Sequence, residues 1–219
     1  MAKRKKNNSK DEEVLVDLVE ARDNVQSFVD KNQNAIFGGL VVVVLAIGGL
    51  ILYNNQIVPK QAKASAEAMW NAENAFARDS FQTVLTDIED NASEIKGSAK
   101  SVAAYYEGVS YLKLGDYDKA IETLSKVKAP SKSVLSIMKH GTLGDAYSEK
   151  GEFSSALSQY EKAAKSDNES ITPIYLMRLG MLQQKENQAS AAQKTFERVV
   201  KDFPKSSQVA NAEKYLTSL

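Results

Sequence analysis

The sequence predicts an all-α protein in which one membrane-spanning helix precedes a solenoid of stacked helical hairpins. Three observations lead to this fold class. Residues 35–53 form an uncharged, almost wholly apolar run. The chain after Pro59 is alanine-rich and helical in its pattern throughout. Within that part, a motif of glycine, alanine and a large residue returns every 36 residues, and a fixed period of this size is typical of a solenoid.

Composition excludes several classes of function. Of the 219 residues, 43% are hydrophobic, and 28 Lys and Arg balance 28 Asp and Glu, so no net charge attracts nucleic acid. The chain has no cysteine and one histidine, which argues against disulfides and against zinc or iron centres. We therefore expect no cofactor, no metal ion, no nucleic acid and no small-molecule substrate.

Residues 1–34 combine a basic tail with an amphipathic helix. Ser9 and Glu12 have the spacing of a capping box, which indicates a helix start. One narrow apolar stripe follows at helical spacing: Val14, Leu18, Ala21, Val25 and Phe28. The stripe needs a partner, which could be the membrane surface, a second copy or another membrane protein. Attraction to anionic lipid is the weakest of these because the segment's charges are balanced.

The apolar run of residues 35–53 predicts a transmembrane helix. At 1.5 Å per residue it would cover about 28 Å, close to the hydrocarbon thickness of a bilayer. A buried core helix would keep a polar edge, which this run lacks. A cleaved signal peptide has a short basic n-region, whereas here 34 residues precede the run, and the small residues 64–66 lie too far beyond it. A retained signal anchor fits better.

The basic tail predicts the orientation of this anchor. Positive charge stays on the cytoplasmic side, so the C-terminal part should be exported. The residues flanking the span do not add to this argument, because they show no charge asymmetry. The basic residues of the tail are Lys3, Arg4, Lys5, Lys6 and Lys10.

Small residues gather on one face of the predicted span, and such a face lets membrane helices approach closely. We expect either lateral packing through this face or plain anchorage. The face comprises Ala35, Gly38, Gly39, Ala46 and Gly49.

Residues 101–205 contain three repeats. Gly108, Gly144 and Gly180 lie 36 residues apart. The same spacing relates the alanines Ala120, Ala156 and Ala192, and also the large residues Leu124, Tyr160 and Phe196. The pattern resembles the tetratricopeptide repeat (TPR), in which L-G-x-x-Y precedes an alanine, an aromatic residue and a proline. Leu143, Gly144 and Tyr147 match its first part, Leu179 and Gly180 match it with Gln183 in place of the tyrosine, and Pro204 closes the third repeat. We expect the small residues to lie where two helices cross.

The turns inside the repeats have their own signals. Gly115 and Gly151 should end the first helix of a hairpin with positive φ. Tyr117 and Phe153 should then fill the turn. The third repeat has Asn187 for the glycine and Ala189 for the aromatic residue, which predicts a looser turn.

The register extends in both directions beyond the three repeats. Moving it back by 36 residues places Ala72, Asp79, Phe81 and Val84 at matching positions, so residues 59–100 should hold a linker and a degenerate first hairpin. Residues 206–219 should form a capping helix, as terminal repeats require.

In this repeat the first helix of each hairpin lines a groove. The expected groove is adaptable and largely apolar, with three methionines, and suits apolar peptide segments. Alternatively, some of these side chains pack against the first hairpin or the capping helix. The predicted groove residues are Val102, Tyr105, Val109, Leu112, Met138, Asp145, Glu149, Ile174, Met177 and Met181. Clamping of a terminal carboxylate is disfavoured because Tyr105 and Val109 replace the lysine and asparagine that it needs.

The sequence does not predict an enzyme. It has no phosphate-binding glycine loop, no H-E-x-x-H motif and no cysteine nucleophile. His140 occupies a packing position in a repeat helix, which favours a structural role. The acidic run of Asp87, Glu89 and Asp90 is typical of a solvated helix face.

From Phe28 onward the chain resembles the ancillary subunit of the bacterial Sec translocon, a single-pass inner-membrane protein with a periplasmic TPR-like domain. The stretches "FVDKNQNAIFGGLVVVV" and "QAKASAEAMWNAENAF" carry the resemblance, which is greater to Bacteroidetes-type relatives than to proteobacterial ones. It implies two partners, the Sec translocon and a membrane-anchored periplasmic chaperone of the prolyl-isomerase type. The alternative is a receptor or assembly scaffold that faces the cytosol from the same anchor.

Overall fold

The computed structural model describes residues 26–28, 31–33, 38–39 and 42–219, and every described regular element is helical. The basic tail, most of the predicted amphipathic helix and Ala35 lie outside these residues. The chain divides into two compact units, residues 1–59 and residues 60–219.

The first unit contains the apolar segment. A helix from Val42 to Ala77 has a window with a mean hydropathy of 1.6, none of which is buried, and by length and composition it could cross a membrane. Its hydrophobic side chains are exposed, for example Leu45 at 69% and Leu52 at 65%. A π-helical stretch, η1 (Tyr53–Ile57), interrupts the α-helical pattern, and the Val58 N–H donates to the Tyr53 carbonyl. Pro59, which lacks an N–H and crowds the preceding turn, gives a physical reason for this irregularity.

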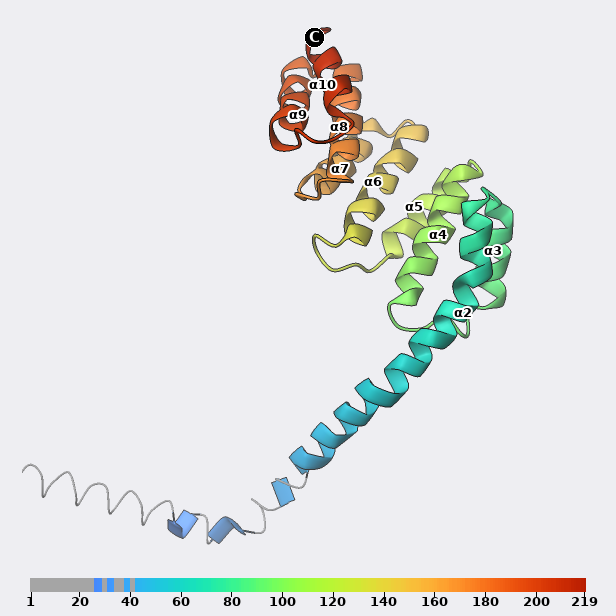
Figure 1. Ribbon diagram of the computed structural model, residues 1–219, viewed down its shortest axis with the longest axis vertical. Coiled ribbons are helices and arrows are strands. Elements are labelled where there is room, and N and C mark those ends of the chain that lie inside the picture. Colours follow the sequence, from blue (N-terminus) through green and yellow to red (C-terminus); the bar gives the residue numbers. More distant parts are fainter. Residues whose placement is uncertain (1–25, 29–30, 34–37, 40–41) are drawn as a thin grey trace, which may run out of the picture. The chain divides into compact units, whose positions relative to one another are not determined.

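The second unit is a row of antiparallel helix pairs closed by a single helix (Figure 1). Residues 59–77, where the sequence predicts a linker and the start of a first hairpin, are helical. The pairs and the last helix are α2 (Val58–Ala77) with α3 (Phe81–Asp90), α4 (Ala99–Lys113) with α5 (Tyr117–Lys126), α6 (Val134–Glu149) with α7 (Phe153–Ala164), α8 (Thr172–Lys185) with α9 (Ala189–Asp202), and α10 (Val209–Leu216).

The repeated glycines mark the helix crossings, as predicted. A Cβ atom on Gly144 would lie 2.5 Å from the Tyr160 ring, closer than real contacts allow. The same holds for Gly108 against Leu124, at 2.6 Å, and for Gly180 against Phe196, at 2.5 Å. The repeated alanines Ala120, Ala156 and Ala192 are fully buried. The 36-residue period therefore identifies one glycine-to-large-residue contact in each of the three repeats.

All four hairpin turns use the same pair of backbone hydrogen bonds. At the first repeat the Asp116 N–H donates to the Tyr111 carbonyl at 2.9 Å and the Gly115 N–H to the Leu112 carbonyl at 3.1 Å. This is the Schellman arrangement, which needs a left-handed residue. Gly115 and Gly151 supply it with φ of +83° and +82°, and Asp79 supplies it in the first hairpin with φ of +55°.

The expectation of a looser third turn is wrong. Asn187 adopts φ of +59°, and the Gln188 N–H donates to the Gln183 carbonyl at 2.8 Å, the same length as the corresponding bond at Gly151. The backbone alone closes the turn, so replacing the aromatic residue with Ala189 does not open it.

The core consists of hydrophobic clusters that follow the row of hairpins. One cluster joins α2, α3 and α4, a second joins α4, α5 and α6, and the largest joins α6 to α10. Helix α10 contributes the fully buried Ala212, and its Tyr215 ring stacks on Phe196 with centroids 5.0 Å apart. Each hairpin thus buries its apolar surface against its neighbours, as expected of a solenoid with a terminal capping helix.

Candidate functional site

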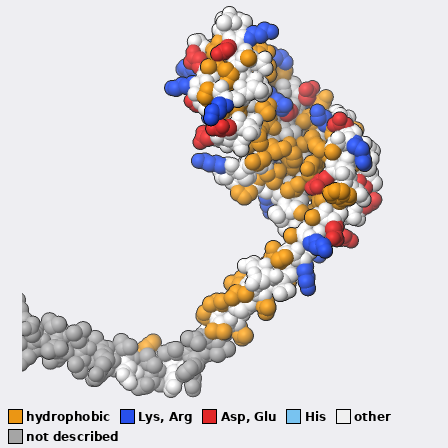
Figure 2. All heavy atoms as spheres, in the orientation of Figure 1, with side chains coloured by type: hydrophobic (Ala, Val, Ile, Leu, Met, Phe, Trp, Pro, Cys, Tyr) orange, Lys and Arg blue, Asp and Glu red, His pale blue; other side chains and the backbone are white. Residues whose placement is uncertain are grey.

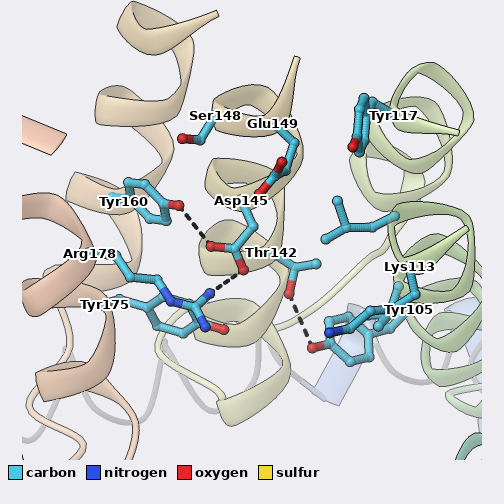
Figure 3. Close-up of a pocket in the computed structure, with 12 residues that line it drawn as sticks. Tyr105, Lys113, Tyr117, Thr142, Asp145, Ser148, Glu149, Tyr160, Tyr175 and Arg178 are labelled. Atoms are coloured by element: carbon cyan, nitrogen blue, oxygen red, sulfur yellow. Dashed lines mark hydrogen bonds and ion pairs between the residues drawn. The ribbon is translucent and has the colours of Figure 1, made fainter. Parts of the chain in front are cut away.

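The main candidate site is a pocket of about 600 Å³ on the first helices of the three repeats. Figure 2 shows hydrophobic side chains, a class that includes tyrosine, gathered over α4 and α6. Figure 3 shows the pocket with α6 at its centre and side chains arriving from both sides. The lining residues are Tyr105, Val109, Leu112, Lys113, Tyr117, Thr142, Asp145, Ser148, Glu149, Tyr160, Tyr175 and Arg178.

An ion pair between two repeats lies at the centre of the pocket. Arg178 of α8 pairs with one carboxylate oxygen of Asp145 on α6. The Tyr160 hydroxyl of α7 donates to the other carboxylate oxygen at 2.7 Å. The two charged side chains are partly shielded, with exposed fractions of 40% for Arg178 and 23% for Asp145. Both carboxylate oxygens therefore have donors, whereas Arg178 has further N–H groups for other acceptors.

A second polar contact connects α4 to α6. The Tyr105 hydroxyl lies 3.2 Å from the Thr142 hydroxyl, and Tyr175 of α8 lines the same pocket. Gly141 makes room for this arrangement, since a Cβ atom there would lie 1.9 Å from the Tyr175 ring. The Arg178 guanidinium lies over that ring, 5.3 Å from its centroid. Hydroxyl groups from three first helices therefore meet at the pocket floor.

The environment keeps the phenols neutral. Burial raises the pKa of Tyr105, and burial together with the charge of Asp145 raises the pKa of Tyr160. Burial, with Tyr105 and Asp145 nearby, raises the pKa of Tyr175 to about 12. Burial lowers the pKa of Arg178, but Asp145 more than offsets this and the net shift is upward. At physiological pH the floor therefore presents hydroxyl donors and a charged guanidinium.

The structure brings five of the ten predicted groove residues into this pocket: Tyr105, Val109, Leu112, Asp145 and Glu149. Val102 instead packs against the cluster of the first hairpin, and Met138 packs against the cluster around α4 and α5. Met177 and Met181 line a separate pocket of about 500 Å³ that α10 helps to form, and Ile174 is 39% exposed on α8.

Sequence reasoning missed the polar groups that dominate the site. Thr142, Tyr175 and Arg178 lie on the helices that the sequence predicts to line the groove, but the predicted groove positions are mainly apolar. Tyr160 was placed at a helix crossing, and its hydroxyl also reaches Asp145. The periodic register gave no signal for Arg178, because the equivalent positions are Thr142 and Tyr106, and Tyr106 does not line the pocket.

The remaining predicted residues lie away from this pocket. Gly38, Gly39, Ala46 and Gly49 are exposed, and a Cβ atom on any of these glycines would meet nothing within 4 Å. His140 is half-buried in α6 with Nδ1 2.9 Å from the Gln159 Oε1, a structural contact inside one hairpin. Glu89 and Asp90 are exposed on α3. The described part of the chain contains no group of acidic and histidine side chains able to hold a metal ion.

Solved structures share the fold. The MamA RS-1 ArsTM double mutant is 18% identical with a TM-score of 0.53, and the alignment covers 81% of this chain and 93% of that one. MamA AMB-1 is 16% identical with a TM-score of 0.52, covering 73% and 81%. At this level of identity the similarity concerns the helical-repeat fold alone. No curated protein matches the sequence.

The sequence match extends over nearly the whole chain. Residues 8–214 match the family described as T7SS, ESX-1 secretion system protein EccA1, N-terminal domain. Together with the fold, this match supports a TPR-type protein-interaction module and does not specify a Sec ancillary subunit. The chain belongs to the TPR-type family of EccA1 N-terminal domains.

Proposed function

We propose that this protein is a membrane-anchored TPR module that binds a segment of another polypeptide in the pocket on α4, α6 and α8. One observation carries the proposal: first helices from three consecutive repeats jointly form a pocket of about 600 Å³, lined by hydroxyl-bearing side chains and by the partly exposed Asp145–Arg178 ion pair. Clefts with a few convergent polar groups are the usual form of a binding site. We assign the protein no catalytic role, in keeping with TPR-like neighbours, which are typically scaffolds.

We place the anchor in a bacterial inner membrane, with the N-terminus in the cytoplasm and the solenoid in the periplasm. The supports are the length and hydropathy of the helix Val42–Ala77 and the basic N-terminal tail.

We further propose that the module is an ancillary subunit of the Sec translocon that links it to a membrane-anchored prolyl-isomerase-type chaperone for newly exported chains. The support is the resemblance of residues 28–219 to that subunit family. The description of the matching family, which names a secretion system protein, is a second support.

Cysteine labelling tests the topology cleanly, because the chain has no cysteine of its own. Gln193→Cys places a thiol on an exposed part of α9, and Asn7→Cys places one in the basic tail. In spheroplasts, a membrane-impermeant maleimide should label the first variant and should label the second only after lysis. The opposite result would favour the cytosol-facing receptor or scaffold.

Photo-crosslinking tests the partner. A photoreactive residue at Leu112, which lines the pocket, should give adducts with translocon subunits, the chaperone or exported chains. A photoreactive residue at Gln193, on the exposed side of α9, is the matched control. Adducts restricted to the protein's own α10 would disprove binding in the pocket. Adducts with other membrane proteins only would disprove the translocon assignment and leave the module intact.

A further inference from the structure

A second pocket, of about 500 Å³, lies between α8 and α10 and shares no lining residue with the pocket on α4, α6 and α8 (Figure 1). Met177 and Met181 line it from α8. The remaining lining residues come from α10 and its flanks: Gln208, Asn211, Lys214, Tyr215 and Ser218. Small-molecule sites span about 300–1,000 Å³, so this pocket can hold a ligand of that size.

The charge of the pocket between α8 and α10 distinguishes it from two other pockets. Lys214 is the one charged residue among the described residues that line it. The pocket on α4, α6 and α8 has two basic and two acidic residues, and so does a pocket of about 530 Å³ at the loops before α8 and α10. No carboxylate in the described part of the chain forms an ion pair with Lys214. The pocket therefore favours a ligand that carries a negative charge.

Neutral hydrogen-bond donors accompany this lysine. Gln208, Asn211 and Lys214 are spaced three residues apart, which places them on one side of α10. Among the described residues, neither side-chain amide has a hydrogen-bond partner, because the bond from Gln208 uses its backbone N–H. Ammonium and amide N–H groups donate, and a carboxylate accepts at both of its oxygens. This side of the pocket therefore suits the carboxylate end of a ligand.

The side of the pocket formed by α8 suits a hydrocarbon chain. Met181 is 37% exposed and accessible to a ligand, whereas Met177 is buried and lies deeper. Methionine side chains are flexible and polarisable, so they adapt to the shape of an apolar group. The Tyr215 ring is fixed beside them, because it stacks on the fully buried Phe196. A ligand with one anionic end and one hydrocarbon end therefore matches both sides of the pocket.

We infer that the pocket between α8 and α10 binds a straight-chain carboxylate of the fatty-acid class. The carboxylate lies at Lys214, and the chain lies against Met177 and Met181. This goes beyond the proposed function, because it concerns a different pocket and a small molecule instead of a polypeptide. Each of the two can fail without the other.

Methyl NMR of the full-length protein in lipid nanodiscs tests the inference. The chain has five methionines, and isotope labelling of their methyl groups makes each one observable. Octanoate is the probe, and dialysis fixes its free concentration despite its partition into lipid. The signals of Met177 and Met181 should shift and saturate as octanoate is added. The signals of Met69 and Met138, which lie in other hydrophobic clusters, should stay in place.

Ligand analogues separate the contribution of the charge from that of the chain. Octylammonium has the same chain with the opposite charge and should bind about tenfold more weakly, because it meets Lys214 as a like charge. Acetate lacks the chain and should cause no shift. From hexanoate to octanoate to decanoate, the affinity should rise by up to about fourfold for each added methylene that becomes buried.

Two lysine variants provide a matched pair for the same assay. Lys214→Gln removes the charge and should weaken octanoate binding about three- to fivefold, the range expected of an ion pair at an exposed lysine. Lys194→Gln removes an exposed charge from α9 that does not line the pocket, and should leave binding unchanged. Circular dichroism verifies that both variants keep their helices.

Several results would overturn the inference. The first is that Met177 and Met181 do not shift at about 10 mM free octanoate, or shift no more than Met69 and Met138. The second is equal affinity for octanoate and octylammonium, or equal weakening by the two lysine variants, because the pocket would then lack a site for the carboxylate. The third is tighter binding of the capped peptide Leu-Leu-Glu-Leu than of any alkyl carboxylate, which would make the occupant a polypeptide. The first two leave the proposed function intact, since crosslinking from Leu112 tests it in the other pocket.

Discussion

At the scale of single residues, the repeated glycines are the most constrained positions in the solenoid. Gly144→Ala would place a methyl group 2.5 Å from the Tyr160 ring, whose hydroxyl is held by Asp145. The ring cannot move freely, so we expect a destabilisation of about 1–3 kcal/mol. Urea unfolding of the purified protein measures it. Gly48→Ala is the control, because a Cβ atom there meets nothing within 4 Å, and an equal loss in both variants would contradict the crossing contact.

The buried phenol of Tyr175 makes a prediction about pH. Its pKa is about 12 in the folded protein against 10.0 for an unperturbed tyrosine. Between these values the unfolded chain loses the proton first, so the free energy of unfolding falls as pH rises from about 10 to 12, by roughly 2–3 kcal/mol. Tyr175→Phe should lack this part of the fall. Subtracting the variant's curve of unfolding free energy against pH from the wild-type curve removes the contribution of lysine titration, which is common to both. A difference that does not change with pH would refute the prediction.

Some residues of the site could be predicted from the sequence and others could not, for a physical reason. Gly108, Gly144 and Gly180 were predictable because their contact recurs in all three repeats. Gly141 and Tyr175 meet only once, so no period reveals them. The Asp145–Arg178 pair depends on how closely α6 and α8 approach, which helical spacing within one chain segment does not specify.

At the scale of elements, the backbone conformation of a hairpin turn determines its geometry more than its match to the repeat motif does. The turn of the third repeat lacks both the glycine and the aromatic residue, yet its 2.8 Å hydrogen bond is as short as that in the turn of the second repeat. The helix pairs were predictable because turn residues and apolar spacing agree. The helix that continues through Pro59 was not, because an internal proline usually ends or kinks a helix, whereas here a π-helical stretch precedes it.

The first hairpin turn offers a stabilising substitution. Asp79 has φ of +55°, a conformation that costs an ordinary residue about 1–2 kcal/mol and costs glycine much less. Asp79→Gly should therefore raise the free energy of unfolding by about 0.5–1 kcal/mol, net of glycine's greater chain entropy. Gly115→Ala, at φ of +83°, should lower it by about 1 kcal/mol. The midpoints of urea unfolding measure both changes in stability. Midpoint shifts of the same sign in the two variants would contradict the left-handed conformation of Asp79 and Gly115.

At the scale of the whole molecule, stacking of the hairpins creates both the pocket and the continuous hydrophobic core, which no single hairpin has. The pocket takes side chains from α4 to α8, and the hydrophobic clusters also pass from one hairpin to the next. The pocket and the stability of the fold therefore depend on the same stacking. The 36-residue period predicted the stacked fold. The polar character of the pocket could not be predicted in this way, because it depends on side chains from neighbouring repeats that come together only in the folded solenoid.

The central claim is that the pocket on α4, α6 and α8 is where the protein holds other polypeptides. The most direct measurement is the yield of intermolecular photo-crosslinks from Leu112 in cells, with and without Ser148→Trp. Ser148 is half-buried and lines the pocket, so the indole fills the space while the hairpin contacts of α6 remain. The account predicts that the yield falls to that of the Gln193 control on α9. An undiminished yield from a filled pocket would contradict it.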